Sequence, residues 1–236
     1  MVEPIRASHR ISLPAFIVAH FAIAALINLI FFAKNAFMPL ASATGGLFTG
    51  SLLVNVALVA ALIWLLIGRY GGLRPYDVGL IPSHILPAIG YTITLWMMAQ
   101  AIHLIFGLLY NGEVRFYPLL ISDGTAAIGW LLAQIIGNAL FEEIAYRGFL
   151  FPQLYLRFAA FEHRPAWRLA ASVILSQILF ALSHIPNRMY LGLNNVQIAF
   201  DLVMLFGWGV LYTLIYLRTG NLFLVVGVHA LGNAPT

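Results

Sequence analysis

The chain has 236 residues, of which 62% are hydrophobic and only 8% are charged, and its mean hydropathy is +0.93. Soluble domains carry about 25% charged residues, so the composition excludes an ordinary soluble domain and predicts one integral membrane domain over residues 1–236. The net charge of +4 comes from arginines spread over several loops, without a basic patch interleaved with aromatic residues, and nucleic-acid binding is not expected. The absence of cysteine excludes disulfides and thiolate metal sites.

Apolar runs in chain order predict an all-α fold, a polytopic transmembrane bundle of about seven helices. Six runs are each about twenty residues long, enough to cross a bilayer. They cover residues 13–33, 47–67, 85–109, 126–150, 167–184 and 196–217, and a seventh apolar segment begins near residue 221. The first run is longer than a signal-peptide core of about 7–15 residues, and we interpret it as a retained first span.

Basic residues are distributed unevenly between the two sets of predicted loops. Only Lys34, Arg115 and Arg188 fall in the loops of one set. The other set, which includes the N-terminal segment, contains Arg6, Arg10, Arg69, Arg74, Arg157, Arg164, Arg168 and Arg218. The positive-inside rule therefore predicts a cytoplasmic N-terminus. A compact set of helices without a soluble domain favours the cytoplasmic (inner) membrane of a prokaryote.

The fourth predicted span contains two adjacent carboxylates and an arginine. Ionisable groups inside a bilayer are costly, and they suggest a function by default. Glu143 and Arg147 are four residues apart with the acid first, the better orientation for a helical ion pair. Glu142 points about 100° away, on the face that it shares with Asn138 and Gln134. We predict that Arg147 neutralises Glu143 and that Glu142 stays free on a polar stripe. The alternative is that both acids only tie helices together.

Two histidines occupy later spans. His184 ends the fifth span, and His229 lies in the last segment with Asn233 one turn beyond it. Together with Glu142, these residues offer one free carboxylate, two imidazoles and one amide from three helices. Peptide-bond hydrolysis needs such groups: a carboxylate to take a proton from water, a histidine to orient the water or bind a metal, and a donor for the oxyanion.

At these residues the sequence resembles the CPBP family of intramembrane proteases, also called the CAAX prenyl protease and bacteriocin-processing or Abi family. The family has three motifs, and each has a counterpart here in the same order. They are residues 142–147 (Glu-Glu-Ile-Ala-Tyr-Arg), residues 180–184 (Phe-Ala-Leu-Ser-His) and residues 229–233 (His-Ala-Leu-Gly-Asn). The resemblance begins near residue 129, which makes residues 126–236 the expected motif-bearing core.

The resemblance implies a membrane-embedded cavity in which Glu142 is the general base that activates water. His184 would share that water with Glu142, and His229 and Asn233 would stabilise the oxyanion. The family is named as a metalloprotease family, so the resemblance also implies that Glu142, His184 and His229 could ligate zinc. This set is less typical of zinc than His-rich or Cys-rich sets. A water activated by Glu142 without a metal is the alternative.

The resemblance also implies that Glu143 and Arg147 hold the fourth helix in register, in agreement with their spacing. Family members commonly have eight spanning helices, against the seven predicted from hydropathy. The expected partners are membrane lipids and a peptide or membrane-protein substrate, and no oligomeric state is predicted.

Depth sets a condition on this site. If the fifth helix enters the membrane at Arg168, His184 lies ~24 Å along it, whereas Glu142 and His229 lie only ~12 Å from the inner side. The side chains can meet only if the fifth helix begins well below the membrane surface or tilts strongly.

Two other functions compete with an intramembrane endopeptidase. A non-catalytic scaffold or bacteriocin-immunity protein of the same fold would keep its phenotype after Glu142→Ala. A proton-coupled transporter could use Asp201 with the other intramembrane ionisable groups as a relay. Transporters often contain repeated halves, and the sequence has no internal repeat, which disfavours this reading. We interpret His20 and His103 as hydrogen-bond partners between helices. CAAX processing itself is not expected, because prenylation is for the most part a eukaryotic signal.

Overall fold

The computed structural model describes residues 6–9, 12–114 and 122–233, and these residues form helices and loops without a β-strand. The predicted all-α class is therefore confirmed for the described chain. Arg10 and Arg115, which contributed to the predicted orientation, lie outside the described residues, as do the last three residues of the expected core.

The first half of the chain contains three long helices, each of which ends in a π-helical turn. The elements are α1 (Ser12–Leu26) with η1 (Ile27–Phe32), α2 (Met38–Ala43), α3 (Gly50–Ala61) with η2 (Leu62–Tyr70), the 3₁₀ turns η3 (Pro75–Val78) and η4 (Pro82–His84), and α4 (Ile85–Phe106) with η5 (Gly107–Asn111).

The second half begins with one continuous helical column over Gly124–Phe158. Its parts are α6 (Gly124–Leu132), η6 (Ala133–Ala139), α7 (Leu140–Glu143), η7 (Ile144–Leu150) and α8 (Phe151–Phe158). The remaining helices are α9 (Pro165–Ser183), α10 (Ile185–Tyr190), α11 (Asn195–Thr219) and α12 (Leu222–Asn233).

Several helix ends follow from local chemistry. The side chains of Thr49, Asp123 and Asn194 each accept a backbone N–H of the first turn of α3, α6 and α11, respectively. Such caps satisfy donors that have no partner within the helix. Helix α11 ends at Gly220, whose φ of 65° is the left-handed conformation that glycine adopts without a Cβ penalty.

Among the described residues, six helical segments are long and apolar enough to cross a membrane. They correspond to the first six predicted spans, and the chain is an integral membrane protein. The seventh predicted span differs: α12 is apolar but has only 12 residues. Its length of ~18 Å is less than the hydrocarbon thickness of a bilayer. In the described chain, α12 is thus a short helix inside the bundle and not a full span.

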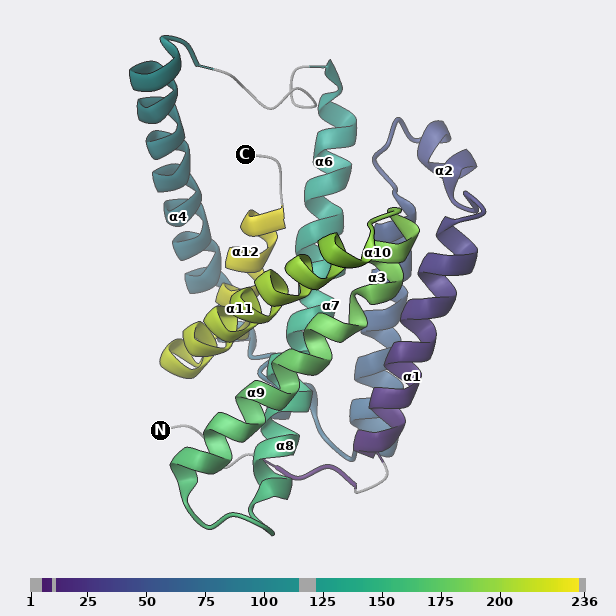
Figure 1. Cartoon of the computed structure of the whole chain (residues 1–236), viewed down its shortest axis with the longest axis vertical. Helices are drawn as coiled ribbons and strands as arrows, with labels where there is room; N and C mark the ends of the chain where they lie inside the picture. The colour runs from purple at the N-terminus through teal and green to yellow at the C-terminus, as the bar shows by residue number, and fades with distance from the viewer. Residues whose placement is uncertain (1–5, 10–11, 115–121, 234–236) are drawn as a thin grey trace.

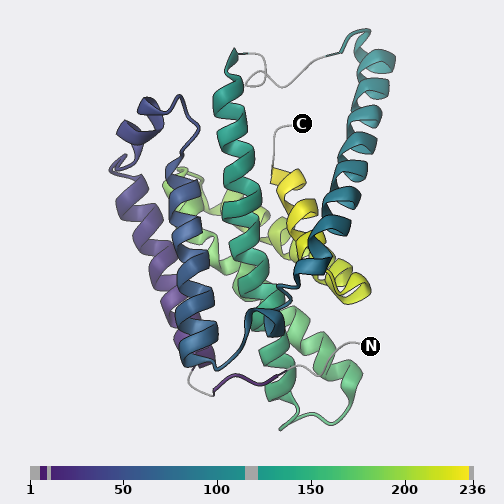
Figure 2. The same cartoon turned by 180° about the vertical axis from the view of Figure 1, so that it is seen from behind.

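The helical column forms the centre of the bundle. In Figure 1, α1 and α3 lie on one side of it and α4 on the other, while α9 and α11 cross in front; Figure 2 shows the same order from behind. All seven residues of η7 are buried, and they contribute much of the apolar core. The column therefore places residues 142–147 at the most enclosed part of the molecule.

Helix α9 is tilted, as it must be if His184 is to lie at the same depth as Glu142. It runs obliquely to the column, and its first turn lies beyond the end of α1, near the foot of α8 (Figure 1). The C-terminal end of α9 consequently reaches the level of α7, well below the upper ends of α4 and α6 in the same view. His184, the residue after α9, therefore lies at the depth of Glu142.

Candidate active site

Glu142 lies in α7 and lines a cavity of about 500 Å³. Its side chain keeps 11% of its accessible surface, so the carboxylate is enclosed but can be reached from the cavity. Asn138 and Gln134 line the same cavity, as the polar stripe of the sequence predicts. His184, His229 and Asn233 line it as well, and the structure thus brings together all four candidate catalytic residues.

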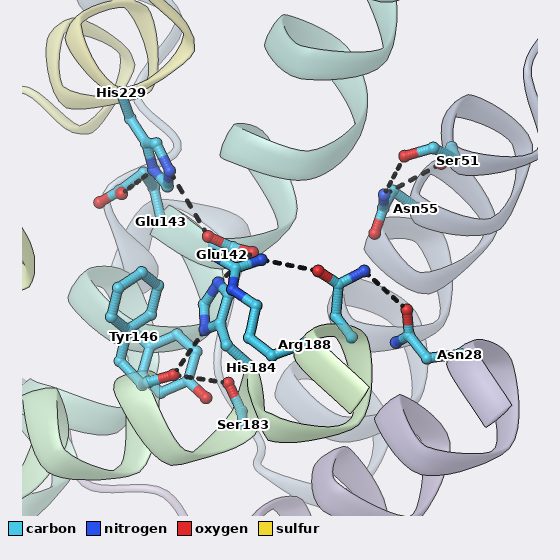
Figure 3. Close-up of polar contacts among 12 residues, drawn as sticks. Asn28, Ser51, Asn55, Glu142, Glu143, Tyr146, Ser183, His184, Arg188 and His229 are labelled. Carbon is cyan, nitrogen blue, oxygen red and sulfur yellow. Dashed lines mark hydrogen bonds and ion pairs between the residues drawn. The ribbon is translucent and has the colours of Figure 1, made fainter. Parts of the chain in front are cut away.

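Two imidazoles flank the Glu142 carboxylate, as Figure 3 shows. Nε2 of His184 lies 3.6 Å from Oε1, and Nε2 of His229 lies 3.5 Å from Oε2. Both separations exceed the length of a direct hydrogen bond. Polar atoms at such a separation are commonly bridged by a water molecule.

The far nitrogens of the two rings determine which nitrogen carries hydrogen. Nδ1 of His184 lies 2.8 Å from the carbonyl oxygen of Phe180, which can only accept, so this nitrogen is assigned as the donor. Nδ1 of His229 lies 2.7 Å from Oε1 of Glu143, a carboxylate paired with arginine, and is assigned in the same way. In the neutral rings, both Nε2 lone pairs then face Glu142. The two Nε2 atoms and the Glu142 carboxylate are then all hydrogen-bond acceptors, so a donor such as water is needed between them.

Asn233 completes the set from the end of α12. It stands four residues after His229, and its exposed amide lines the same cavity. The ring of His229 is fixed by stacking on Tyr212, with centroids 4.7 Å apart. The His229 imidazole thus approaches Glu142 from α12, which also carries Asn233 to the cavity, while His184 approaches from the end of α9.

Glu143 and Arg147 form the ion pair that their spacing predicts, with Nη1 and Oε1 3.1 Å apart and both side chains fully buried. The same Glu143 oxygen also accepts from His229, a contact that local spacing does not predict. A single carboxylate therefore joins the arginine of the column to the imidazole of α12.

Arg147 also binds two groups on neighbouring helices. Its Nη2 donates to Oε1 of Gln177 on α9 at 3.0 Å and to the carbonyl oxygen of Gly209 on α11 at 2.9 Å. Its guanidinium lies over the ring of Phe180, 4.8 Å from the centroid. Gly209 has no side chain to displace the Gln177 amide, which explains the close approach of α11. The buried arginine thus fastens three helices around the site.

Two π-helical turns, η6 and η7, stand directly before and after α7. Such turns are rare in proteins as a whole, but those that occur are often found at functional sites. The extra residue in the turn shifts the direction of the side chains that follow. The two turns bring Asn138 and Tyr146 beside the residues of α7. A further π-helical turn, η1, carries Asn28 to the wall of the cavity.

A chain of polar contacts along the wall of the cavity was not predicted from the sequence. Nδ2 of Asn187 donates to Oδ1 of Asn28 at 2.9 Å, and Nη1 of Arg188 donates to Oδ1 of Asn187. Nε of Arg188 also binds Oδ2 of Asp201 at 2.6 Å. Asp201 is therefore held in an ion pair between α10 and α11, which weakens its assignment to a proton relay. The sequence feature that could have indicated these contacts is Arg188, a charged residue one turn after His184.

His20 connects α1 to the column, as an interhelical histidine should. Its Nε2 lies 2.8 Å from the hydroxyl of Tyr146, and its ring stacks between Phe16 and Phe141. The interpretation of His20 as a hydrogen-bond partner is confirmed, and the same interpretation of His103 stays a prediction.

Comparison with known proteins identifies the family. Residues 124–235 match the family model described as type II CAAX prenyl endopeptidase Rce1-like. The matched segment contains all three motifs and every candidate catalytic residue. Through this segment, residues 124–235 match the CPBP/CAAX protease family. No curated protein and no solved structure matches the chain. The match supports an intramembrane endopeptidase in general terms, which agrees with the cavity within the bundle.

The site contains side chains of the types that ligate metals, but these side chains are not arranged as metal ligands are. Glu142, His184 and His229 would be a His₂Glu set, and both Nδ1 atoms bind outward as in many metal-bound histidines. Yet no group of three His, Asp or Glu side chains in the described chain is arranged to hold an ion. The geometry therefore does not fit a bound metal as it stands.

Proposed function

We propose that this protein is an intramembrane endopeptidase that hydrolyses peptide bonds with a water molecule activated by Glu142. One observation carries the proposal: the Glu142 carboxylate lies between the Nε2 atoms of His184 and His229, 3.6 and 3.5 Å away, on the wall of a cavity within the helical bundle. Such an arrangement suits a water that donates to a carboxylate and a ring nitrogen together.

In the first step, the water bridges Glu142 and Nε2 of His184. Glu142 takes one proton while the water oxygen bonds to the carbonyl carbon of the scissile peptide. The carbonyl π electrons move to oxygen and produce a tetrahedral oxyanion. The Nδ2 group of Asn233 donates to that oxyanion, and so does Nε2 of His229, which takes up a proton from solvent before the substrate binds. Nδ1 of His229 already donates to Glu143, and that negative charge stabilises the doubly protonated ring.

In the second step, the tetrahedral intermediate collapses. The C–N bond breaks, and Glu142 returns its proton to the departing amine nitrogen. The products are a new carboxyl group and a new amino group, and the carboxylate is regenerated for the next water. Throughout both steps, Arg147 holds Glu143 in place through their ion pair, and Glu143 in turn holds His229.

The experiment compares membrane proteomes from cells that express the wild type or Glu142→Gln. We expect new peptide termini with the wild type alone, because glutamine keeps the shape of the side chain but cannot accept the proton. Glu162→Gln, which removes a partly exposed carboxylate outside the cavity, is the matched control and should cleave like the wild type. Identical termini in all three samples would contradict the proposal and favour a non-catalytic scaffold.

A second experiment tests whether the mechanism operates without a metal. Wild-type protein treated with a strong chelator, with its metal content measured by mass spectrometry, should keep its cleavage activity. Activity that disappears on chelation and returns with zinc would instead assign Glu142, His184 and His229 as ligands.

We further propose that the basic end of the bundle faces the cytoplasm of a prokaryotic cell. Several arginines of the described chain meet at that end. Arg6 and Arg74 pair with Asp77 at 3.9 and 3.1 Å, and Arg157 donates to the carbonyl oxygen of His9. The hydrogen bond from the Arg74 side chain holds the pKa of Asp77 below its usual value. This concentration of arginine supports a cytoplasmic N-terminus.

The absence of cysteine makes the orientation easy to test, since any introduced thiol is unique. Ser42, at the end of α2, and His163, between α8 and α9, are both exposed and lie at opposite ends of the bundle (Figure 1). A membrane-impermeant maleimide added to intact bacterial cells should label Ser42→Cys alone. His163→Cys should react only after lysis. Labelling of His163→Cys in intact cells would reverse the orientation.

A further inference from the structure

One wall of the cavity is built from carboxamides that the proposed mechanism does not use. Gln134 on η6 and Asn55 on α3 belong to this wall, and Asn138 lies between Gln134 and Glu142 on the polar stripe. Helix α3 packs directly on η6, where a Cβ at Gly137 would make an ordinary van der Waals contact with Cβ of Asn55. The two packed helices thus present amide side chains to the cavity that Glu142 also lines.

The amide of Asn55 is held in one orientation. Its Nδ2 donates to the carbonyl oxygen of Ser51 at 3.0 Å and to the Ser51 hydroxyl at 3.3 Å. Its Oδ1 has no hydrogen-bond partner within the described chain, and Figure 3 shows Asn55 and Ser51 across the cavity from Glu142. The amide therefore presents an acceptor, not a donor, to the cavity.

Gln134 holds a second acceptor beside the cavity, which its side chain lines. Its Oε1 is covered from solvent yet has no partner among the residues that the structure describes. Buried polar atoms without a partner are uncommon in native proteins and call for a specific explanation. In the empty cavity, water can reach Oδ1 of Asn55, whereas Oε1 of Gln134 becomes accessible once its amide turns toward the cavity that the side chain lines. A peptide bound next to Glu142 would displace the water from Asn55, and both acceptors would then need N–H donors from the peptide.

We propose that Asn55 and Gln134 are positioning residues that accept hydrogen bonds from main-chain N–H groups of the substrate. The inference rests on the proposed peptidase function and specifies how the substrate is held. Within a helix, nearly all N–H groups bond to carbonyls one turn back, so only an extended or unwound segment can supply them. A cavity of about 500 Å³ is within the usual range for binding pockets.

The substrate class follows from this geometry. The protein takes polypeptide segments that are extended at the cleavage site, and it recognises the main chain more than particular side chains. Proline has no N–H group, so it should be depleted at the substrate positions that face Asn55 and Gln134. The membrane-proteome comparison between wild type and Glu142→Gln provides the cleavage sites in which this depletion is counted.

A synthetic peptide copied from one such site tests the contacts directly. Each peptide N–H near the scissile bond is replaced in turn by an ester oxygen, which removes one donor and keeps the chain geometry. The set is measured with purified wild type, Asn55→Leu and Gln134→Met. Gln100→Met is the matched control, because Gln100 is also a partly buried glutamine but does not line the cavity. Thermal unfolding checks that each variant is folded.

With the wild type, we expect an ester at one or two positions to lower kcat/KM roughly threefold to tenfold, mainly through KM. Asn55→Leu or Gln134→Met should lower kcat/KM for the all-amide peptide by a similar factor and then be insensitive to the ester at its own position. Gln100→Met should behave like the wild type. Equal ester penalties in all four proteins, or cleavage sites rich in proline, would overturn the inference. Absence of any Glu142-dependent cleavage would overturn the proposed function and this inference with it.

Discussion

Arg147→Met should lower the free energy of unfolding by about 3–5 kcal/mol, the cost of leaving a buried charge without its partner. The substitution removes hydrogen bonds to Glu143, Gln177 and the Gly209 carbonyl in one step. Methionine fills much of the volume, so the loss measures the polar contacts more than a cavity. Detergent-solubilised protein unfolded by denaturant provides the measurement.

Three comparison variants separate this effect from a general sensitivity of the bundle. Arg218→Met removes an exposed arginine at the end of α11 and should change stability by less than about 0.5 kcal/mol. Arg147→Lys keeps the charge but cannot reproduce the planar fork, and it should fall between the wild type and methionine. Glu143→Leu combined with Arg147→Met should cost less than Arg147→Met alone, because no uncompensated carboxylate remains. Equal losses for Arg147→Met and Arg218→Met would show that the buried network contributes little.

The parts of the site that the sequence predicted correctly depend on short spacings. Glu143 and Arg147 stand one turn apart on one helix, so their contact follows from helical geometry. The polar stripe of Gln134, Asn138 and Glu142 follows from the same periodicity and does line the cavity. The roles of the candidate catalytic residues came from the three motifs, and they stay proposals until activity is measured.

The parts that the sequence did not predict depend on contacts between distant segments. The bond between His229 and Glu143 joins residues 86 positions apart, and the pair of Asn187 and Asn28 joins residues 159 positions apart. No local spacing encodes such contacts. The π-helical turns also escaped prediction, because an extra residue in a turn leaves the apolar run unchanged. Hydropathy also indicates that the last segment is apolar, but it cannot indicate that α12 packs inside the bundle.

Glu143→Gln should lower kcat by about 10²–10³-fold, the usual cost of losing one oxyanion donor, and change KM little. The reason lies in the protonation of His229. Its Nδ1 already donates to Glu143 at 2.7 Å, so Nε2 can donate to an oxyanion only when the ring carries both protons. The buried negative charge of Glu143 stabilises that form, and a neutral glutamine of the same shape does not. Single-turnover kinetics with a peptide from an identified cleavage site would measure kcat separately from product release.

A structural explanation for the same loss must be excluded, since Glu143 also partners Arg147. Gln177→Met provides the control: it removes one Arg147 contact without touching the bond between Glu143 and His229. It should lower stability and leave kcat close to the wild-type value. ¹⁵N-histidine spectra should also differ for His229 in Glu143→Gln and match the wild type in Gln177→Met. If both variants lose kcat in proportion to their stability, Glu143 serves only to anchor Arg147, and the charge on His229 has to come from another group in the cavity.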